Sequence, residues 1–325
     1  MKYNATLNST LGGFMMTTIN EKNLRPASEE KIGSFSLNRL EEASQRFSCS
    51  DYISEARDNF PQSRQFFNEV WRAKVCEWFY AFIDHHENEL SREVVWISMN
   101  LLDRYLAKAS PSFEVEDQER AKHHYQIASM ACLYLGCKVH YRNEKTLFTN
   151  EDNDVVSAKL LIQMGTAGFT EQDLYSMKDK ILLTLQWDIC PVTPAMFLRC
   201  LIARIVVITG QELAESLYQE CCFLCELATC DYFFVPCSAS KVAMSSLLCA
   251  SKDLPSELQG LVLHNLHQTR ETQLKSDDLR VWQNRLELLC AQVYEDEQQL
   301  KPQIQRVNPP VQRVCRVVSS EQLNT

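Results

Sequence analysis

The segment from residue 71 to residue 106 constrains the fold of this chain most, because it combines two helical patterns with two internal charges. In its second half, Val94, Ile97, Leu101 and Tyr105 recur at helical spacing and form an apolar stripe. The first half is apolar on more than one side. This pattern predicts two packed helices, with the first at the centre of a helical bundle.

Two charged residues, Arg72 and Asp103, lie within these otherwise apolar helices. Charges in apolar surroundings are tolerated mainly when they are paired. We therefore expect Arg72 and Asp103 to form a structural ion pair that locks the two helices together.

Helical periodicity, helix caps and the spacing of proline and glycine predict an all-α chain. Thr170 and Asp173 form a capping-box pattern, and Thr193 precedes Pro194 as a second N-cap. A short helix is expected between residues 37 and 67, packed on the first bundle. The main helices are predicted at 64–86, 91–109, 119–140, 153–164 and 170–187, and then at 194–208, 211–230, 237–252, 256–268 and 276–295.

These helices divide into two groups of five at similar spacing, which predicts two tandem five-helix bundles. We expect an N-terminal bundle with its preceding helix at 37–190 and a C-terminal bundle at 191–298. Residues 1–36 and 299–325 are polar or proline-containing and are predicted to be flexible tails.

Composition excludes several classes of function. The chain has 325 residues, a formal net charge of -9 and a pI near 5.4, which argues against a nucleic-acid partner. Only 8 glycines occur, and no glycine-rich phosphate loop is present. No apolar run reaches the roughly 18 residues of a membrane span, so we expect no membrane partner. The 14 cysteines in helical segments indicate reduced thiols inside the cell.

Potential catalytic or metal-binding residues are more simply explained by structure. Cys222 and Cys225 form a CxxC pattern, but no second ligand pair has zinc-site spacing, so we expect a packed helix face. The pairs His85-His86 and His123-His124 lack the spacing of a metalloprotease motif. We therefore expect a non-catalytic protein that needs no cofactor and no metal and acts through its surface.

Several segments, in the same order, resemble the cyclin family. WRAKVCEW at 71–78 is similar to the family's Met-Arg-Ala-Ile-Leu-x-x-Trp motif, and LLDRYL at 101–106 to its Ile-Asp-Arg-Phe/Tyr-Leu motif. The resemblance continues through 133–141 and 169–198 and, more weakly, as far as Tyr294. Each motif alone is weak, so the specificity comes from their combination.

This resemblance implies a regulatory subunit that binds and activates a cyclin-dependent serine/threonine kinase and so regulates cell-cycle progression. The positions that match the family's kinase-binding face are Lys138, Val139, Lys178, Leu182, Trp187 and Ile189. Lys178 departs from the family, which usually has glutamate there, and would repel Lys138 unless Asp179 turns in or the kinase supplies an acid. The family's acidic pair after the lysine is also replaced, by His140-Tyr141.

The resemblance also implies a patch that docks Arg-x-Leu segments of substrate or inhibitor proteins. Its matching residues are Trp71, Lys74, Val75 and Trp78, whereas the family has Met and Ile at the first two positions. Since a lysine disfavours an incoming arginine, we expect binding of ordinary Arg-x-Leu segments to be weak.

Two other functions remain open. Lys178 and His140-Tyr141 favour a degenerate cyclin-fold adaptor that activates no kinase. A cyclin-box scaffold of the general-transcription-factor type is the other alternative, although the acidic charge balance counts against it. We expect a location in the nucleus and the cytoplasm.

Overall fold

The computed structural model shows a chain whose regular structure is helical throughout its described residues. The predicted tail at 1–36 and nearly all of that at 299–325 lie outside these residues. None of the described helices is both long and apolar enough to cross a membrane. The described ranges are 37–59, 68–86, 90–109, 118–144, 156–165, 168–269 and 276–300.

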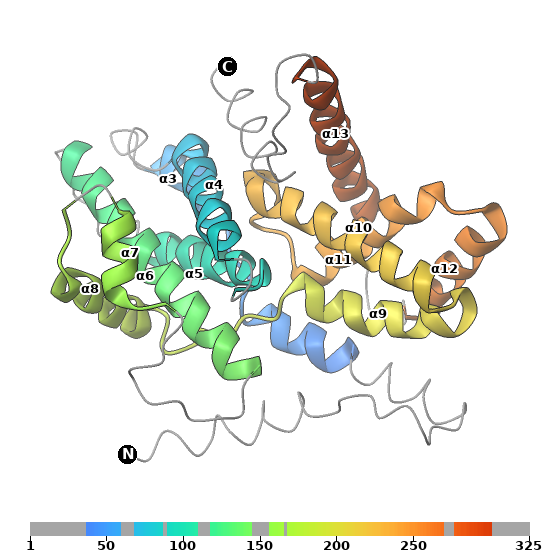
Figure 1. The fold of residues 1–325 in the computed structure, drawn as a ribbon, viewed down its shortest axis with the longest axis horizontal. Helices are drawn as coiled ribbons and strands as arrows, with labels where there is room; N and C mark the ends of the chain where they lie inside the picture. Colours follow the sequence, from blue (N-terminus) through green and yellow to red (C-terminus); the bar gives the residue numbers. More distant parts are fainter. Residues whose placement is uncertain are drawn as a thin grey trace.

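Two helical bundles lie side by side, and the chain completes the first before it enters the second (Figure 1). The all-α, two-bundle prediction is therefore confirmed. The first bundle consists of α4 (Glu69–His85), α5 (Glu93–Ala109), α6 (Gln118–Glu144), α7 (Ala158–Met164) and α8 (Glu171–Thr184). The second consists of α9 (Pro194–Thr209), α10 (Gln211–Cys230), α11 (Ala239–Ala250), α12 (Ser256–Thr269) and α13 (Ser276–Leu300), with the 3-10 helices η4 (Tyr232–Phe234) and η5 (Ser251–Asp253).

Helix α5, not α4, is the central helix of the first bundle, so the prediction of a central first helix is wrong. α5 packs against α3, α4, α6, α8 and α10, and the side chains along most of its length are buried. Gly136 of α6 lies against Ser98 of α5, and a Cβ at Gly136 would collide with that serine side chain. The small residue therefore permits the close approach of α5 and α6.

Helix α4 is apolar on several sides because each side faces a different neighbour. Cys76 and Phe79 are buried in the core. Trp71, Val75 and Trp78 are only half-buried and line a surface groove described below. Other parts of α4 contact α10 of the second bundle.

The predicted helix caps are present. Thr170 and Asp173 form a reciprocal capping box at the start of α8. The Thr193 hydroxyl accepts a hydrogen bond from the backbone of Met196, with Pro194 at the first turn of α9. Such caps depend on neighbours in the sequence, so their chemistry is visible before the fold is known.

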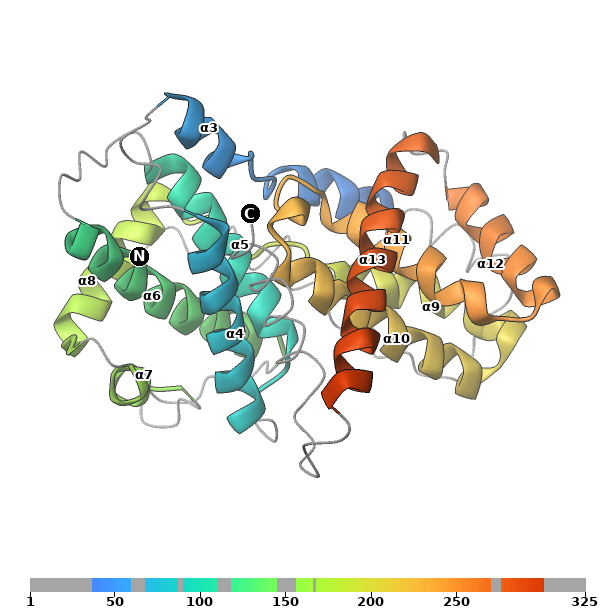
Figure 2. The same cartoon turned by 90° about the horizontal axis from the view of Figure 1, so that it is seen from above.

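The segment before the first bundle forms two helices where one was expected. The first, over residues 37–45, lies beside the second bundle rather than on the first (Figures 1 and 2). The second, α3 (Tyr52–Asn59), packs on α5. Asn100 of α5 donates a hydrogen bond of 3.0 Å to the carbonyl of Phe47 between them. The segment therefore bridges the two bundles.

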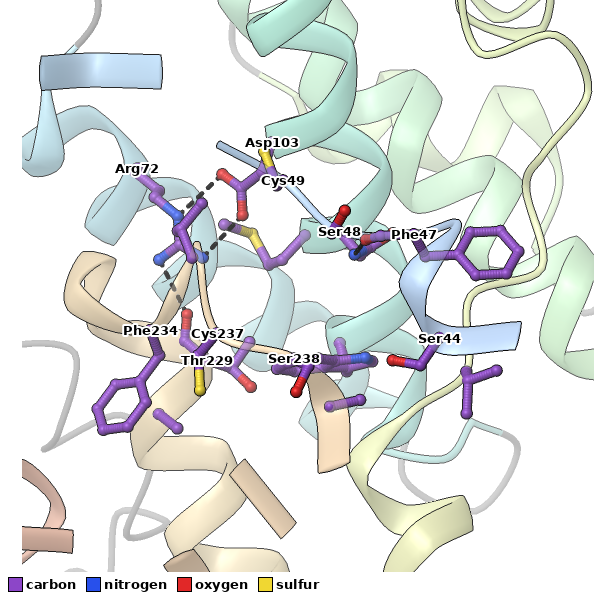
Figure 3. Close-up of a pocket in the computed structure, with 17 residues that line it drawn as sticks. Ser44, Phe47, Ser48, Cys49, Arg72, Asp103, Thr229, Phe234, Cys237 and Ser238 are labelled. Carbon is purple, nitrogen blue, oxygen red and sulfur yellow. Dashed lines mark hydrogen bonds and ion pairs between the residues drawn. The ribbon is translucent and has the colours of Figure 1, made fainter. Parts of the chain in front are cut away.

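The buried ion pair of Arg72 and Asp103 lies where the two bundles meet (Figure 3). The guanidinium donates two hydrogen bonds to the carboxylate, from Nε at 3.0 Å and from Nη2 at 2.9 Å. Its Nη1 atom donates to the carbonyl of Thr229 in α10 at 2.9 Å. The Tyr52 hydroxyl of α3 donates to the same carboxylate at 3.0 Å. One ion pair thus joins α3, α4, α5 and α10.

A second charged cluster crosses the junction between the bundles. Arg92, before α5, forms ion pairs with Asp84 of α4 and with Glu226 of α10, the latter at 3.0 Å. Burial raises the pKa of Glu226 from 4.5 to about 7, although the charge of Arg92 opposes this shift. The carboxyl group therefore takes up protons more readily in the folded chain than in the unfolded chain.

Removing one partner of the central ion pair is expected to be strongly destabilising. Arg72→Ala leaves Asp103 buried without its counter-charge, at a cost of about 3–5 kcal/mol in the free energy of unfolding. Chemical denaturation should show this loss, and the melting temperature should fall by several degrees. The double variant Arg72→Met/Asp103→Leu should recover part of the stability, because no buried charge remains.

Lys252→Ala provides the matched control, since Lys252 and Glu287 form an ion pair in which both side chains are well exposed. Exposed pairs contribute about 0–1 kcal/mol. If Arg72→Ala costs no more than Lys252→Ala, the buried pair does not hold the bundles together.

The raised pKa of Glu226 predicts a pH-dependent effect on stability. Because the folded chain binds the proton more tightly, ionisation of Glu226 between pH 4.5 and about 7 lowers the free energy of unfolding. Relative to Glu226→Gln, the wild-type chain should lose about 1–3 kcal/mol as the pH rises through this window. Urea unfolding at several pH values measures the difference, with the exposed Glu212→Gln on the same helix as control. Parallel profiles for wild type and Glu226→Gln would contradict the prediction.

Candidate protein-binding surfaces

The residues predicted to bind a partner kinase separate in the structure into buried and accessible groups. Val139 and Leu182 are core residues, with 6% and 5% of their surfaces exposed. They cannot present side chains to a partner, because they lie on the inward sides of α6 and α8. Ile189 is half-buried and packs against the core. These three positions therefore support the surface from beneath.

Two accessible lysines belong to a cluster with two tyrosines, which we call the lysine–tyrosine cluster: Tyr134, Lys138, Tyr175 and Lys178. The tyrosine rings of α6 and α8 meet edge to face, with centroids 6.2 Å apart. Lys138 Nζ lies 5.2 Å from the centre of the Tyr134 ring, and Lys178 Nζ lies 5.3 Å from that of Tyr175. Each ammonium group thus has an aromatic face near it, a favourable electrostatic arrangement.

Asp179 turns toward Lys178. This was one of the two expected ways of reducing the repulsion between Lys138 and Lys178, where the family has a glutamate in place of Lys178. Its carboxylate lies 3.2 Å from Lys178 Nζ. Because 65% of the Asp179 side chain is exposed, the pair contributes little to stability, and its effect is to reduce the local positive charge. His140 is buried, while the side chain of Tyr141 lies outside the described residues.

The end of α8 presents two large apolar side chains, Leu183 and Trp187, which we call the α8 end. Leu183 is 70% exposed and Trp187 is 61% exposed. Leu183 was not predicted to belong to this surface. Neighbouring residues on a helix point about 100° apart, and the sequence alone did not show that Leu183 faces outward while Leu182 faces the core. The predicted helix to residue 187 is also too long, since α8 ends at Thr184.

The turn after α8 has an unusual backbone. Gln186 and Trp187 have φ angles of 54° and 63°, in the left-handed region that residues with side chains seldom adopt. The Trp187 amide donates to the Leu182 carbonyl at 2.9 Å. Arg104 donates to the Asp188 carbonyl at 2.8 Å, and Arg46 pairs with its carboxylate at 2.6 Å. These contacts hold Trp187 outward.

The residues predicted to dock substrates all line one groove between α4 and α6, which we call the α4–α6 groove. It has a volume of about 320 Å³, within the lower range of ligand sites. Trp71, Lys74, Val75 and Trp78 form its α4 wall. The structure thus brings the whole predicted patch together.

The opposite wall of the groove was not predicted, because it comes from residues distant in sequence. Lys122 and Met130 of α6, Met164 of α7 and Phe169 before α8 also line it. The Trp71 and Tyr125 rings meet edge to face across the groove, with centroids 5.5 Å apart. Lys74 and Lys122 are the charged residues among the described lining residues.

The CxxC pair that was predicted to lie on a packed helix face is part of α10. Cys222 and Cys225 are free thiols, as are the other cysteines in the described ranges. Burial raises the pKa of Cys222 to about 11, which disfavours a reactive thiolate. Within the part of the chain that the structure describes, no cluster of His, Cys, Asp and Glu residues could hold a metal ion.

Several curated relatives are plant cyclins. The chain is 24% identical to Cyclin-B2-4 of Arabidopsis thaliana, over 60% of this chain and 39% of that protein. It is 28% identical to G2/mitotic-specific cyclin S13-6 of Glycine max, over 56% and 34%, and 23% identical to Cyclin-A3-3 of Arabidopsis thaliana, over 71% and 61%. The matched segments thus span less than two thirds of each of these relatives.

Among solved structures, an X-ray structure of a viral cyclin from herpesvirus saimiri matches with a TM-score of 0.44 and 18% identity. The match covers 63% of this chain and 83% of that chain. Two family models match successive parts of the chain: the cyclin N-terminal domain at residues 38–190 and the cyclin C-terminal domain at residues 192–318. Because these two models together cover most of its length, the chain belongs to the cyclin family.

Proposed function

We propose that this cyclin binds a cyclin-dependent protein kinase and activates it, as a non-catalytic regulatory subunit that controls cell-cycle progression. Two relatives carry the names of mitotic cyclins. In the family, the cyclin pushes the C helix of the kinase inward and orders its activation loop, which completes the ion pair and metal sites for phosphoryl transfer. This action requires a rigid apolar face with a few charges that set its register.

The α8 end is the observation that carries this proposal. Leu183 and Trp187 expose large apolar side chains to water. This exposure does not stabilise the chain on its own, whereas burying both side chains against a partner would be favourable. Left-handed backbone at two successive residues costs of order 1–3 kcal/mol each, and such strain is concentrated at functional sites. A partner that covers both side chains explains the exposure and the strain together.

The lysine–tyrosine cluster supplies the charges. We assign to Lys138, in the C-terminal half of α6 beside the Tyr134 ring, the role of donating hydrogen bonds to backbone carbonyls of the kinase. Asp179 partly neutralises Lys178 without help from a partner. The departure from the family's glutamate is therefore compatible with kinase binding.

Lys178 also favours a second candidate function, that of an adaptor that binds proteins through the same fold but activates no kinase. The lysine removes the acid that family members use at this position, and the exposed Asp179 replaces it only in part. We further propose that the α4–α6 groove docks substrate or inhibitor proteins in either case.

The α8 end can be tested by stability alone. Trp187→Gly should lower the free energy of unfolding by no more than about 1 kcal/mol, because the exposed indole contributes little packing and glycine relieves the left-handed strain. Phe79→Ala, at a fully buried aromatic side chain, should cost about 3–5 kcal/mol. Urea denaturation measures both. A large loss for Trp187→Gly would mean that the indole holds the fold together rather than awaiting a partner.

Kinase binding is tested by affinity purification of the tagged chain from its own cell lysate, with mass spectrometry and a kinase assay on the eluate. Leu183→Asp and Lys138→Glu should each lower the co-purified kinase activity at least about tenfold, because each places charge against the bound face. Leu288→Asp on α13 is the matched control, since Leu288 is also an exposed leucine, with 56% exposed.

The outcomes separate the two candidate functions. A kinase that is captured and active, and lost with Leu183→Asp but retained with Leu288→Asp, supports activation. Captured proteins without kinase activity support the adaptor. A kinase whose amount and activity do not respond to either substitution on α6 and α8 would show that this surface is not where it binds.

A further inference from the structure

We propose that the α4–α6 groove binds an apolar peptide segment flanked by acidic residues, in place of an Arg-x-Leu segment. This inference rests on the proposed role of the groove as a docking site and assigns the chemistry of its ligand. It follows from the composition of the groove walls and from the signs of the charges at its edges.

The two walls present matching helical faces. On α4, Trp71, Lys74, Val75 and Trp78 follow one another at i, i+3, i+4 and i+7, so they share one side of the helix. On α6, Lys122, Tyr125, Gln126, Ser129 and Met130 repeat the same pattern. Both helices pack on α5 beneath them, which leaves the groove open between their outer sides.

The groove is lined by the side chains best suited to hold an apolar segment. Trp71 and Trp78 are half-buried, Met164 is 38% exposed and Phe169 is buried. Tryptophan and methionine are enriched in the buried centres of protein interfaces, and methionine adapts its shape to different partners. We therefore expect one or two large apolar side chains of the ligand to occupy the groove.

Lysine supplies both charges of the lining, one on each wall. Lys74 is exposed, and none of its atoms forms an ion pair within the described ranges. Lys122 approaches Glu119 at 4.0 Å, but both side chains are more than half exposed, so water weakens this pair. The long apolar stems of the lysines can line the walls while their ammonium groups stay at the rim.

This arrangement selects the charge of the ligand. Aspartate or glutamate beside the apolar side chains can form charge-assisted hydrogen bonds with the ammonium groups at the rim. An arginine at the same place would face like charges on both walls. This repulsion lowers the affinity for Arg-x-Leu segments. The preference is local, because the chain as a whole carries a net charge of -9 and would not otherwise attract acidic segments.

The test uses the full chain, without any kinase, to select binders from a phage-displayed library of random 12-residue peptides. The wild-type chain should enrich peptides in which aspartate or glutamate flanks large apolar residues. The variant Lys74→Glu/Lys122→Glu should instead enrich lysine and arginine. The control Lys108→Glu/Arg280→Glu changes the charge equally at exposed positions outside the groove and should select the same peptides as wild type.

Fluorescence anisotropy with one selected peptide then measures the effect. The double substitution in the groove should weaken its binding about tenfold or more, and replacing the acidic residues of the peptide by arginine should do the same to the wild-type chain. Combining both changes should restore binding, because the signs again match.

Three results would overturn the inference: enrichment of basic peptides by wild type, no enrichment of any peptide, or an equal loss in the control variant. None of them depends on a kinase. If no kinase co-purifies but acidic peptides are selected, kinase activation is rejected and the proposed ligand of the groove is supported. If an active kinase co-purifies but no acidic peptides are selected, kinase activation is supported and the proposed ligand is rejected.

Discussion

The buried ion pair of Arg72 and Asp103 is the interaction on which the arrangement of the two bundles depends. A guanidinium group has five N–H donors in a fixed plane, and here they are shared between a carboxylate on α5 and backbone carbonyls at the end of α10. Burial works against the charge of Arg72, yet Asp103 raises its pKa well above the usual value. Because neither charge can leave the other without a large penalty, the pair joins α4 to α5 and links both helices to the second bundle.

The sequence predicted most of the helices from local signals, and it predicted this pair from two charges isolated within apolar helices. A cap such as Thr170 with Asp173 requires neighbours three residues apart, and two isolated charges within apolar helices have few other ways of being satisfied. The role of α4 could not be obtained in this way. Its apolar residues on several sides suggested a central helix, whereas they face the core, α10 and a groove. Periodicity indicates which sides of a helix are apolar, but it does not indicate which other part of the protein covers each side.

The candidate site was predictable in location but not in detail. The α4 wall of the groove lies within one motif, so all four of its residues were identified, while Lys122, Met164 and Phe169 come from segments that only the fold brings together. At the other surface, a difference of one residue on α8 decides between burial and exposure, as Leu182 and Leu183 show. The left-handed turn at Gln186 and Trp187 contains no glycine, so the sequence did not indicate it, although the backbone bond from Trp187 to Leu182 closes the end of the helix there.

The two candidate surfaces share positive charge. The lysine–tyrosine cluster and the α4–α6 groove each carry two lysines on a chain whose net charge is -9. Positive patches on an acidic surface orient an approaching partner, because the rest of the molecule repels the acidic segment that the patch attracts. Since exposed charges contribute modestly to affinity, their main effect is on the rate and register of docking, while the apolar side chains they flank provide the affinity. If the two surfaces bind partners as proposed, Lys178 and Lys74, which depart from the family's residues, change the charge that a partner meets and leave the neighbouring apolar side chains in place.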